Sequence, residues 1–317
     1  MRAYRVAYDG RAYHGFQRQP DVPTVEDALC SGLRELGLEF EGTPPGYAAA
    51  GRTDRGVSAL AQTVAFDAPE WLTPRAFTTH LPEDVHVWAS ASVPEDFHAT
   101  HDAISREYTY FLHASDGFRD PDGESVSGLG HGAVGEAAPE PGREMGDLPA
   151  PDRIGELESR LSGEHDFHNL SAAEAGTVRD LSVTSSRAGE YRVIEVRAAG
   201  FPRQLVRRLV SLYDRVRRGE DSLAFVDRVL SPEPLPGPEG IEPAPAHPLV
   251  LTEVAYGVDF EPDPTAAALA HEALSAQARR DRTRATALDS IDGRLEFGPD
   301  DRAEGSTSEI GGRPDNP

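Results

Sequence analysis

The strongest constraint on the fold is an alternation of short strands and helices that occurs twice along the chain. In "YRVAYDG", Tyr4, Val6 and Tyr8 share one face of a predicted strand that ends in an Asp-Gly turn. "TVEDALCSGLREL" then carries an apolar helical stripe, with Thr24 as its expected N-cap. A second helix is predicted at "TPRAFTTHLP", where a proline fits the first turn. Further strands are predicted near residues 46–50, 61–67 and 85–93. This order is that of a ferredoxin-like unit.

A similar set begins at "SREYTYFLHA", where Tyr108 and Tyr110 lie on the same strand face. A helix at "PDRIGELESRLSG" and a last strand at "LVLTEVAYGV" are expected. Between them we predict strands near 179–187 and 191–199 and a helix at 202–218. The chain is therefore predicted to be an α+β protein with two ferredoxin-like (RRM-like) halves, 1–100 and 101–260, around a mixed, mostly antiparallel sheet.

Two segments fall outside this plan. Residues 114–152 are rich in Gly, Pro and acidic residues, which is typical of a solvated insertion. Residues 261–317 form an acidic tail that we expect to be partly disordered, with one possible helix at 264–280. The tail is not expected to carry catalytic residues.

The charge of the chain bears on its partners. The chain has 54 acidic and 31 basic residues, which gives a net charge of −23, and every one of these basic residues is arginine. Such a charge normally argues against a nucleic-acid partner. In molar salt, however, the Debye length falls to about 3 Å, so that local arginine clusters decide binding. A lysine-free acidic composition suits such a cytoplasm, and a halophilic source is our hypothesis.

Several other classes of protein are excluded by composition. No run of 18 apolar residues and no signal peptide are found, so we expect a cytoplasmic protein without membrane contact. Cys30 is the single cysteine and lies on the predicted inner face of a helix, which indicates packing. With no cysteine cluster and no close histidine pair, we expect no metal site.

The stretch "GRTDRG" is the first candidate for chemistry. Gly51 and Gly56 permit tight backbone turns, so the loop can present Asp54 in a fixed pose. Arg52 and Arg55 favour the ionised form of that carboxylate, which can then act as a nucleophile or an electrostatic stabiliser. A solvated Asx-type turn with surface arginines is the alternative.

Two further segments carry candidates. In "FPRQLVRRLVSLYDRVRR", residues 203–218 hold six arginines and one acid, and Arg203 and Arg207 lie one turn apart. These arginines could bind phosphates or hold a catalytic carboxylate, or they could form structural salt bridges. Tyr108, close to Arg106, could stack on a base or be an ordinary core aromatic.

The motifs together resemble those of the TruA-type tRNA pseudouridine synthases. "GRTDRGVSALAQ" is similar to the family's aspartate motif, and "YDGRAYHGFQRQP" with "TVEDAL" resembles its N-terminal strand and helix. "LPEDVHVWASASVPEDFHATHDAISREYTY", "TVRDL", "FPRQLVRRLV" and "HPLVLTEVAY" follow in the family's order. The resemblance covers most of residues 4–256.

The resemblance implies a role for particular residues. Asp54 would be the catalytic aspartate, Arg207 the arginine that pairs with it, and Tyr108 the tyrosine that stacks on the flipped base and assists proton removal at C5. Arg52 would guide the everted nucleotide. The other residues expected to bind RNA are Gln17, Arg55, Gln62, Arg106, Arg203 and Arg208.

The resemblance also implies the substrate and the assembly. The protein would isomerise uridine to pseudouridine at positions 38, 39 and/or 40 of the tRNA anticodon stem-loop, without cofactor or metal. It would form a homodimer and bind tRNA in a central positively charged cleft. A non-catalytic tRNA-binding or chaperone module on the same fold is the main alternative. A carboxylate hydrolase is a weaker one, since no second catalytic carboxylate is evident.

Overall fold

The computed structural model describes residues 1–113, 150–173, 175–237 and 240–296. The predicted insertion lies outside these residues except for 150–152, where a helix begins, and the last part of the tail lies outside them as well. The chain divides into a unit of residues 1–270 and a second unit of residues 271–317. None of the helices in the described ranges is long and apolar enough to cross a membrane.

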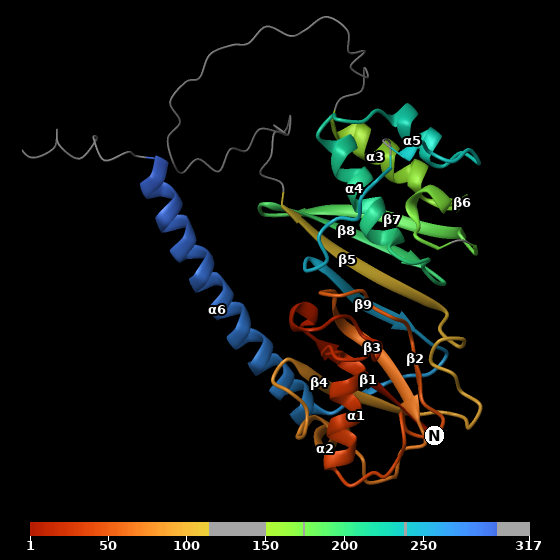
Figure 1. The fold of residues 1–317 in the computed structure, drawn as a ribbon, viewed down its shortest axis with the longest axis vertical. Helices are drawn as coiled ribbons and strands as arrows, with labels where there is room; N and C mark the ends of the chain where they lie inside the picture. Colours follow the sequence, from red (N-terminus) through yellow and green to blue (C-terminus); the bar gives the residue numbers. More distant parts are fainter. Residues whose placement is uncertain (114–149, 174, 238–239, 297–317) are drawn as a thin grey trace, which may run out of the picture. The chain divides into compact units, whose positions relative to one another are not determined.

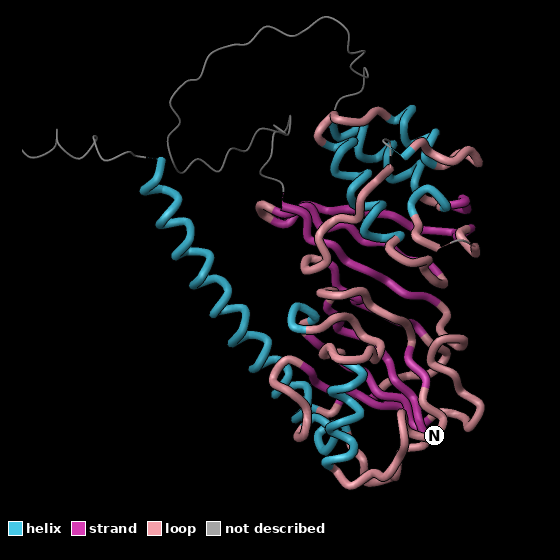
Figure 2. The backbone as a smooth tube through the Cα atoms, in the orientation of Figure 1, coloured by secondary structure: helices cyan, strands magenta, loops and turns pink. Residues whose placement is uncertain are grey.

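The first unit is built on one ten-stranded sheet (Figures 1 and 2). Its strand order is β10-β4-β1-β3-β9-β5-β8-β7-β6, and β2 pairs with β3 beside this path. The strands are β1 (Arg2–Tyr8), β2 (Ala48–Ala49), β3 (Ser58–Phe66), β4 (Val85–Ser92), β5 (Ser105–His113), β6 (Gly163–Asp166), β7 (Val178–Ala188), β8 (Tyr191–Ala198), β9 (Leu249–Ala255) and β10 (Glu261–Pro262). The α+β class is confirmed.

The sheet is mixed but mostly antiparallel, as predicted. Its one parallel pairing among the described residues joins β3 to β9, with Ser58 opposite Val250 and Ala59 opposite Leu251. On its other edge β9 pairs with β5 in antiparallel fashion. The last long strand of the first unit therefore lies at the centre of the sheet and connects elements from the start and the middle of the chain.

Most helices form where sequence patterning expects them. They are α1 (Val25–Glu35), α2 (Pro74–Thr78), α3 (Ala150–Leu161), α4 (Leu205–Arg217), α5 (Leu223–Val229) and α6 (Pro264–Glu296), with short 3₁₀ turns η1 (Gly10–Ala12) and η2 (His168–Leu170). Thr24 is the N-cap of α1, because its hydroxyl oxygen accepts a hydrogen bond from the Asp27 amide. In Figure 1, α1 and α2 lie beside β1 and β4, whereas α3, α4 and α5 gather near β7 and β8.

Some boundaries and short elements differ from the sequence prediction. α4 begins at Leu205 instead of residue 202, because Gln204 adopts a left-handed backbone conformation, with φ of 63°. α6 extends to Glu296, beyond the helix expected at 264–280. The short elements β6, β10 and α5 were not predicted, since two to seven residues carry too little periodicity.

The helices pack on the sheet through two hydrophobic clusters. One surrounds Tyr4, Phe66 and Phe77, whose rings stack or meet edge to face within 6.2 Å of one another. The other is built from α3, α4 and the strands beneath them and includes Tyr213. Tyr108 packs against both clusters, so it lies where they meet. Cys30 is buried and free, as expected, and burial raises the pKa of its thiol to about 11.

The Phe77→Ala variant tests the first cluster. Phe77 is fully buried between Tyr4 and Phe66, so we expect the substitution to lower the free energy of unfolding by about 3–5 kcal/mol. Phe111→Ala is the matched control, because that ring is 44% exposed and its loss should cost about 0.5 kcal/mol or less. Thermal and denaturant unfolding in high salt would measure both, and equal losses would contradict the assignment of this core.

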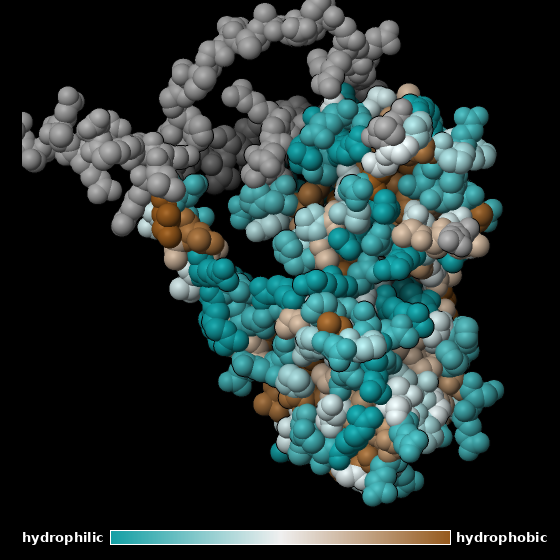
Figure 3. Space-filling view, viewed as in Figure 1, coloured by the Kyte–Doolittle hydropathy of each residue, from teal (hydrophilic) through white to brown (hydrophobic). Residues whose placement is uncertain are grey.

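Salt dependence is a second expected property. The net charge is −23, and hydrophilic residues cover most of the face drawn in Figure 3. Diluting the salt from 1 M to 0.1 M lengthens the Debye length from about 3 to about 10 Å, so that the acidic side chains repel one another more strongly. We expect the free energy of unfolding to fall on dilution. Unfolding that is equally cooperative and stable in dilute buffer would contradict the halophilic hypothesis.

Candidate nucleotide-binding active site

A cavity of about 1120 Å³ opens between the loop that precedes β3 and the start of α4. The "GRTDRG" loop forms one wall, and the segment from Phe201 to Arg207 forms another. Tyr108 of β5 lies between them, and residues 14–17 and 47–49 are among the others that line it. This volume is at or above the upper end of the range of about 300–1,000 Å³ seen for pockets that enclose a drug-sized ligand.

Hydrogen bonds from buried side chains hold the loop that carries Asp54. The buried hydroxyl groups of Tyr8 and Thr53 hydrogen-bond at 2.8 Å, and the Gln62 side-chain amide donates to the Gly51 carbonyl at 2.9 Å. Gly56 adopts φ of 81°, a left-handed conformation that a β-carbon would strain. Asp54 is therefore presented on a fixed backbone, with 29% of its side chain exposed. The backbone does turn here, since the Val57 amide donates to the Asp54 carbonyl at 3.1 Å, and Arg52 and Arg55 are exposed, as the alternative expected.

Asp54 faces the guanidinium of Arg207 across the cavity. Arg207 Nη1 lies 3.5 Å from Asp54 Oδ2, and only 17% of the arginine side chain is exposed. Arg207 Nε donates to the Ala244 carbonyl at 2.7 Å, which fixes the direction of the fork. An arginine held in this way can keep the carboxylate of its partner in one orientation. The two residues are 153 positions apart in the chain.

Tyr108 closes the cavity between the two walls. Its ring meets that of Phe201 edge to face, with 5.2 Å between the centroids. Burial raises the pKa of the Tyr108 phenol to about 12; nearby Arg106 lowers it and Asp54 raises it further. The phenol is therefore neutral near pH 7 and can donate a hydrogen bond into the cavity.

Known proteins resemble this chain over nearly its whole length. A family profile described as "tRNA pseudouridine synthase" matches residues 159–257. "tRNA pseudouridine synthase A" of Haloarcula marismortui is 51% identical over 294 residues, 92% of this chain and 98% of that protein. The protein of that name from Halobacterium salinarum is 51% identical over 267 residues, 84% of this chain and 89% of that protein. That from Methanocella arvoryzae is 34% identical over 278 residues, 86% of this chain and 91% of that protein. The chain belongs to the tRNA pseudouridine synthase A family.

The chain is accordingly a tRNA pseudouridine synthase, an isomerase. The likeness to relatives from halophilic archaea agrees with its acidic, lysine-free composition.

Most residues selected from the sequence of this synthase line the cavity. Besides Asp54, Tyr108 and Arg207, the cavity is lined by Gln17, Arg52, Arg55 and Arg203. Arg52, Arg55 and Arg203 are exposed, so their guanidinium groups are accessible to phosphates. They supply a local positive charge that the net charge of the chain conceals.

Three other selected residues lie outside the lining. Gln62 is fully buried and supports the aspartate loop. The Arg208 guanidinium donates to the Ile241 carbonyl and to Gln204 Oε1, and the Arg106 guanidinium donates to three backbone carbonyls. The side chains of all three are thus engaged within the protein.

The arginines at the distal end of α4 have a structural role. Arg217 pairs with Asp214 at 2.8 Å, Arg218 pairs with Asp214 at 3.0 Å, and Arg215 pairs with Asp221 at 2.7 Å. Structural salt bridging, one of the two alternatives weighed for this helix, therefore applies at its end, whereas at its start Arg207 contacts Asp54.

Some lining residues were not selected from the sequence. These are His14, Phe16, Glu26, Tyr47, His98, Phe201 and Gln204, among others. Gln204 has a left-handed backbone conformation that no local sequence pattern predicts. The other residues lie on segments that come together only in the folded chain. Phe201, beside Pro202 in the arginine motif, carried the clearest signal.

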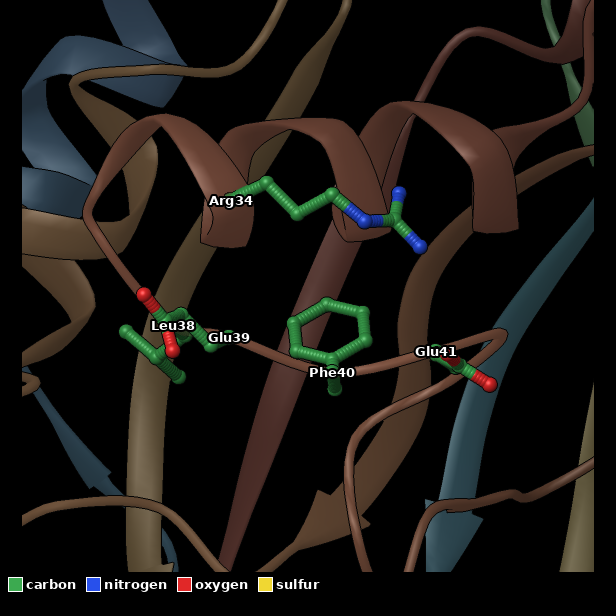
Figure 4. A pocket seen from close by; sticks show the side chains of 5 residues that line it. All are labelled: Arg34, Leu38, Glu39, Phe40 and Glu41. Atoms are coloured by element: carbon green, nitrogen blue, oxygen red, sulfur yellow. The ribbon is translucent and has the colours of Figure 1, made fainter.

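No metal site is evident in the ranges that the structure describes, since no three His, Cys, Asp or Glu side chains come together there. A smaller hollow of about 580 Å³ lies after α1, where the Arg34 guanidinium covers the Phe40 ring at 4.6 Å (Figure 4). Arg34 also donates to the Gly42 carbonyl at 2.8 Å, so its cation is already used within the protein.

Gly15→Ala tests whether the loop position matters. Gly15 has φ of 105°, and a β-carbon there would lie 2.8 Å from the Thr53 carbonyl oxygen, which must then move. Because a shift of 1 Å can cost about 100-fold in rate, we expect pseudouridine formation to slow by about 10- to 100-fold.

Gly37→Ala is the matched control, since it has φ of 87° and no atom within 4 Å of the added carbon. It should lose stability but keep its rate. Equal rates in the two variants, measured at saturating tRNA, would contradict the steric argument.

Proposed function

We propose that this synthase isomerises uridine at positions 38, 39 and/or 40 of the tRNA anticodon stem-loop, with the target base turned out of its stack into the cavity. The observation that carries the proposal is the contact between Asp54 and Arg207 beside Tyr108, in a cavity large enough for a nucleotide. Extruding a base costs a few kcal/mol, which contacts in the cavity must offset.

The reaction breaks the C1′–N1 bond and forms a C1′–C5 bond, so that the proton on C5 leaves and N1 gains one. Asp54 can assist by attacking C1′, by adding to C6 of the uracil or by removing the C2′ proton. Arg207 Nη1 lies 3.5 Å from Asp54 Oδ2 and can hold the carboxylate in place when the base enters the cavity. Each of the three routes requires an ionised Asp54.

Tyr108 contributes as a neutral phenol. Its ring forms a wall against which the base can stack, and Phe201 holds the ring from the side. With a pKa of about 12 the hydroxyl can take up the C5 proton only if it passes its own proton onward. N1 of the turned base is an acceptor for such a proton.

The exposed arginines that line the cavity indicate how the rest of the tRNA is bound. Arg52, Arg55 and Arg203 are placed to contact phosphates on either side of the everted nucleotide. We further propose that the halves 1–100 and 101–260 form the two sides of the tRNA cleft, that the enzyme acts in the cytoplasm as a homodimer, and that it needs no cofactor.

Asp54→Asn tests the catalytic assignment. The substitution removes the negative charge while keeping the shape, so we expect pseudouridine formation in an anticodon stem-loop to fall below detection, with folding and tRNA binding retained. Asp96→Asn, at an exposed carboxylate outside the cavity, should behave as the unsubstituted enzyme. Near-normal turnover by Asp54→Asn would refute the assignment, and an inactive wild-type enzyme that binds tRNA would favour the non-catalytic module.

The pH dependence tests the role of Tyr108. Because its pKa is raised to about 12, the fraction of phenolate at pH 8 is about 10⁻⁴. We expect the single-turnover rate to stay flat from about pH 7 to 10. A step that needed the phenolate would instead accelerate about tenfold per pH unit.

The upper limit of this window has a structural reason. Burial raises the pKa of Tyr4 and Tyr213 to about 12, above the ordinary value of about 10. A group of this kind stabilises the fold fully below its unfolded-state pKa, and that stability is lost as the pH rises from about 10 through 12. Circular dichroism at each pH would confirm that the fold is intact. Tyr108→Phe, which keeps the ring, should be slower at every pH.

A further inference from the structure

Arg106 is a buried cation with backbone partners. It lies on β5, and its side chain is 9% exposed. Its guanidinium donates to the Ala50 carbonyl from both Nε (3.1 Å) and Nη2 (2.6 Å), to the Thr100 carbonyl from Nη2 (2.7 Å) and to the Ala199 carbonyl from Nη1. Four hydrogen bonds to three carbonyls satisfy most of the donors of the fork.

The three carbonyls belong to three different borders of the cavity. Ala50 precedes the aspartate loop, Thr100 lines the cavity itself, and Ala199 precedes the wall that runs from Phe201 to Arg207. Gly51 and Gly200 flank the guanidinium at ordinary contact distance, since a β-carbon on them would lie 3.8 Å from Arg106 Nε and 3.9 Å from Nη1. One side chain thus ties together segments that are distant in sequence.

Arg106 also shares a strand face with Tyr108, two residues further along β5. β5 therefore carries both the Tyr108 phenol and the Arg106 guanidinium, which binds the backbone at Ala50 and at Ala199. The Arg106 charge lies close enough to lower the pKa of Tyr108, against the effect of burial. Arginine suits this position because its planar fork reaches several acceptors at once, whereas a lysine ammonium has one small head group.

We propose that Arg106 is a positioning residue that sets the separation between the Asp54 loop and the Arg207 helix, and that it does not contact RNA. The inference rests on the proposed function, because the rate that it governs is that of uridine isomerisation. It replaces the role in RNA binding that the sequence suggested for this arginine with one inside the protein.

Arg106→Gln and Arg106→Lys test the proposal through separate measurements of rate and binding. Because misplacement by 1 Å can cost about 100-fold, we expect the single-turnover rate at saturating tRNA to fall by about 100-fold in Arg106→Gln and by less in Arg106→Lys. The Kd for tRNA should not change. The slope of log Kd against log salt should also not change, whereas loss of a phosphate contact would reduce it by about one. Weaker binding with a smaller slope and a normal rate would overturn the proposal.

Amide hydrogen exchange gives a readout that needs no substrate. Releasing the Ala50 and Ala199 carbonyls should speed exchange at Ala50, Gly56 and Val57, whose amides donate hydrogen bonds in the aspartate loop and its flanks, and leave exchange in β1 unchanged. Arg75→Gln, at an exposed arginine outside the cavity, is the matched control and should alter neither rate nor exchange. A folded Arg106→Gln variant with normal rate and normal exchange would also overturn the proposal.

Two further measurements keep the test decisive. If Arg106→Gln does not fold, Arg106→Ala with added ethylguanidinium replaces it. We then expect ethylguanidinium to restore part of the rate and part of the protection from exchange. If the variant binds ethylguanidinium and recovers neither, the proposal is overturned. If the unsubstituted enzyme forms no pseudouridine, the proposed function fails, and the exchange measurement alone then decides whether Arg106 joins the loop to the helix.

Discussion

The active site depends on where β9 enters the sheet. β9 pairs in parallel with β3 on one side and in antiparallel fashion with β5 on the other, which brings the loop before β3 to the same side as Tyr108. Parallel neighbours require a long crossover connection, and here the chain between β3 and β9 includes α4. Two residue pairs, Ser58 with Val250 and Ala59 with Leu251, therefore join the strands in an arrangement that brings Asp54 close to Arg207.

Electrostatic organisation in this protein is local. The chain carries a net charge of −23, yet the cavity is lined by Arg52, Arg55, Arg203 and Arg207 and, among the residues that the structure describes, by only two carboxylates, Glu26 and Asp54. Other arginines bind groups within the protein: Arg217 and Arg218 form ion pairs with Asp214, and Arg106 donates hydrogen bonds to backbone carbonyls. In concentrated salt an exposed charge acts over about 3 Å, so the spacing of these groups matters more than their sum. An acidic protein can therefore bind an acidic polymer.

Sequence reasoning succeeded where the signal was local or carried by several motifs in order. Period-two alternation predicted β1 and β5, period-3.6 stripes predicted α1 and most of α4, and Thr24 capped its helix as expected. It was less successful where partners were distant. Gln62 and Arg106 are polar residues within motifs and were assigned to RNA, but the fold turns both toward backbone groups. The first residue of α4 was misplaced because the left-handed conformation of Gln204 has no sequence signal.

The sequence by itself determined the family and the α+β class, because each depends on residue types at given places in an ordered set of motifs, and it singled out Asp54, Tyr108 and Arg207 as candidates for chemistry. Only the tertiary structure decided how these residues meet. The contact at 3.5 Å between Asp54 and Arg207 spans 153 positions, and the position of Tyr108 between two hydrophobic clusters depends on a sheet assembled from both ends of the first unit. Local periodicity fixes which residues share a strand or a helix face. The juxtaposition of faces depends on long-range pairing, whose free energy no short segment contains.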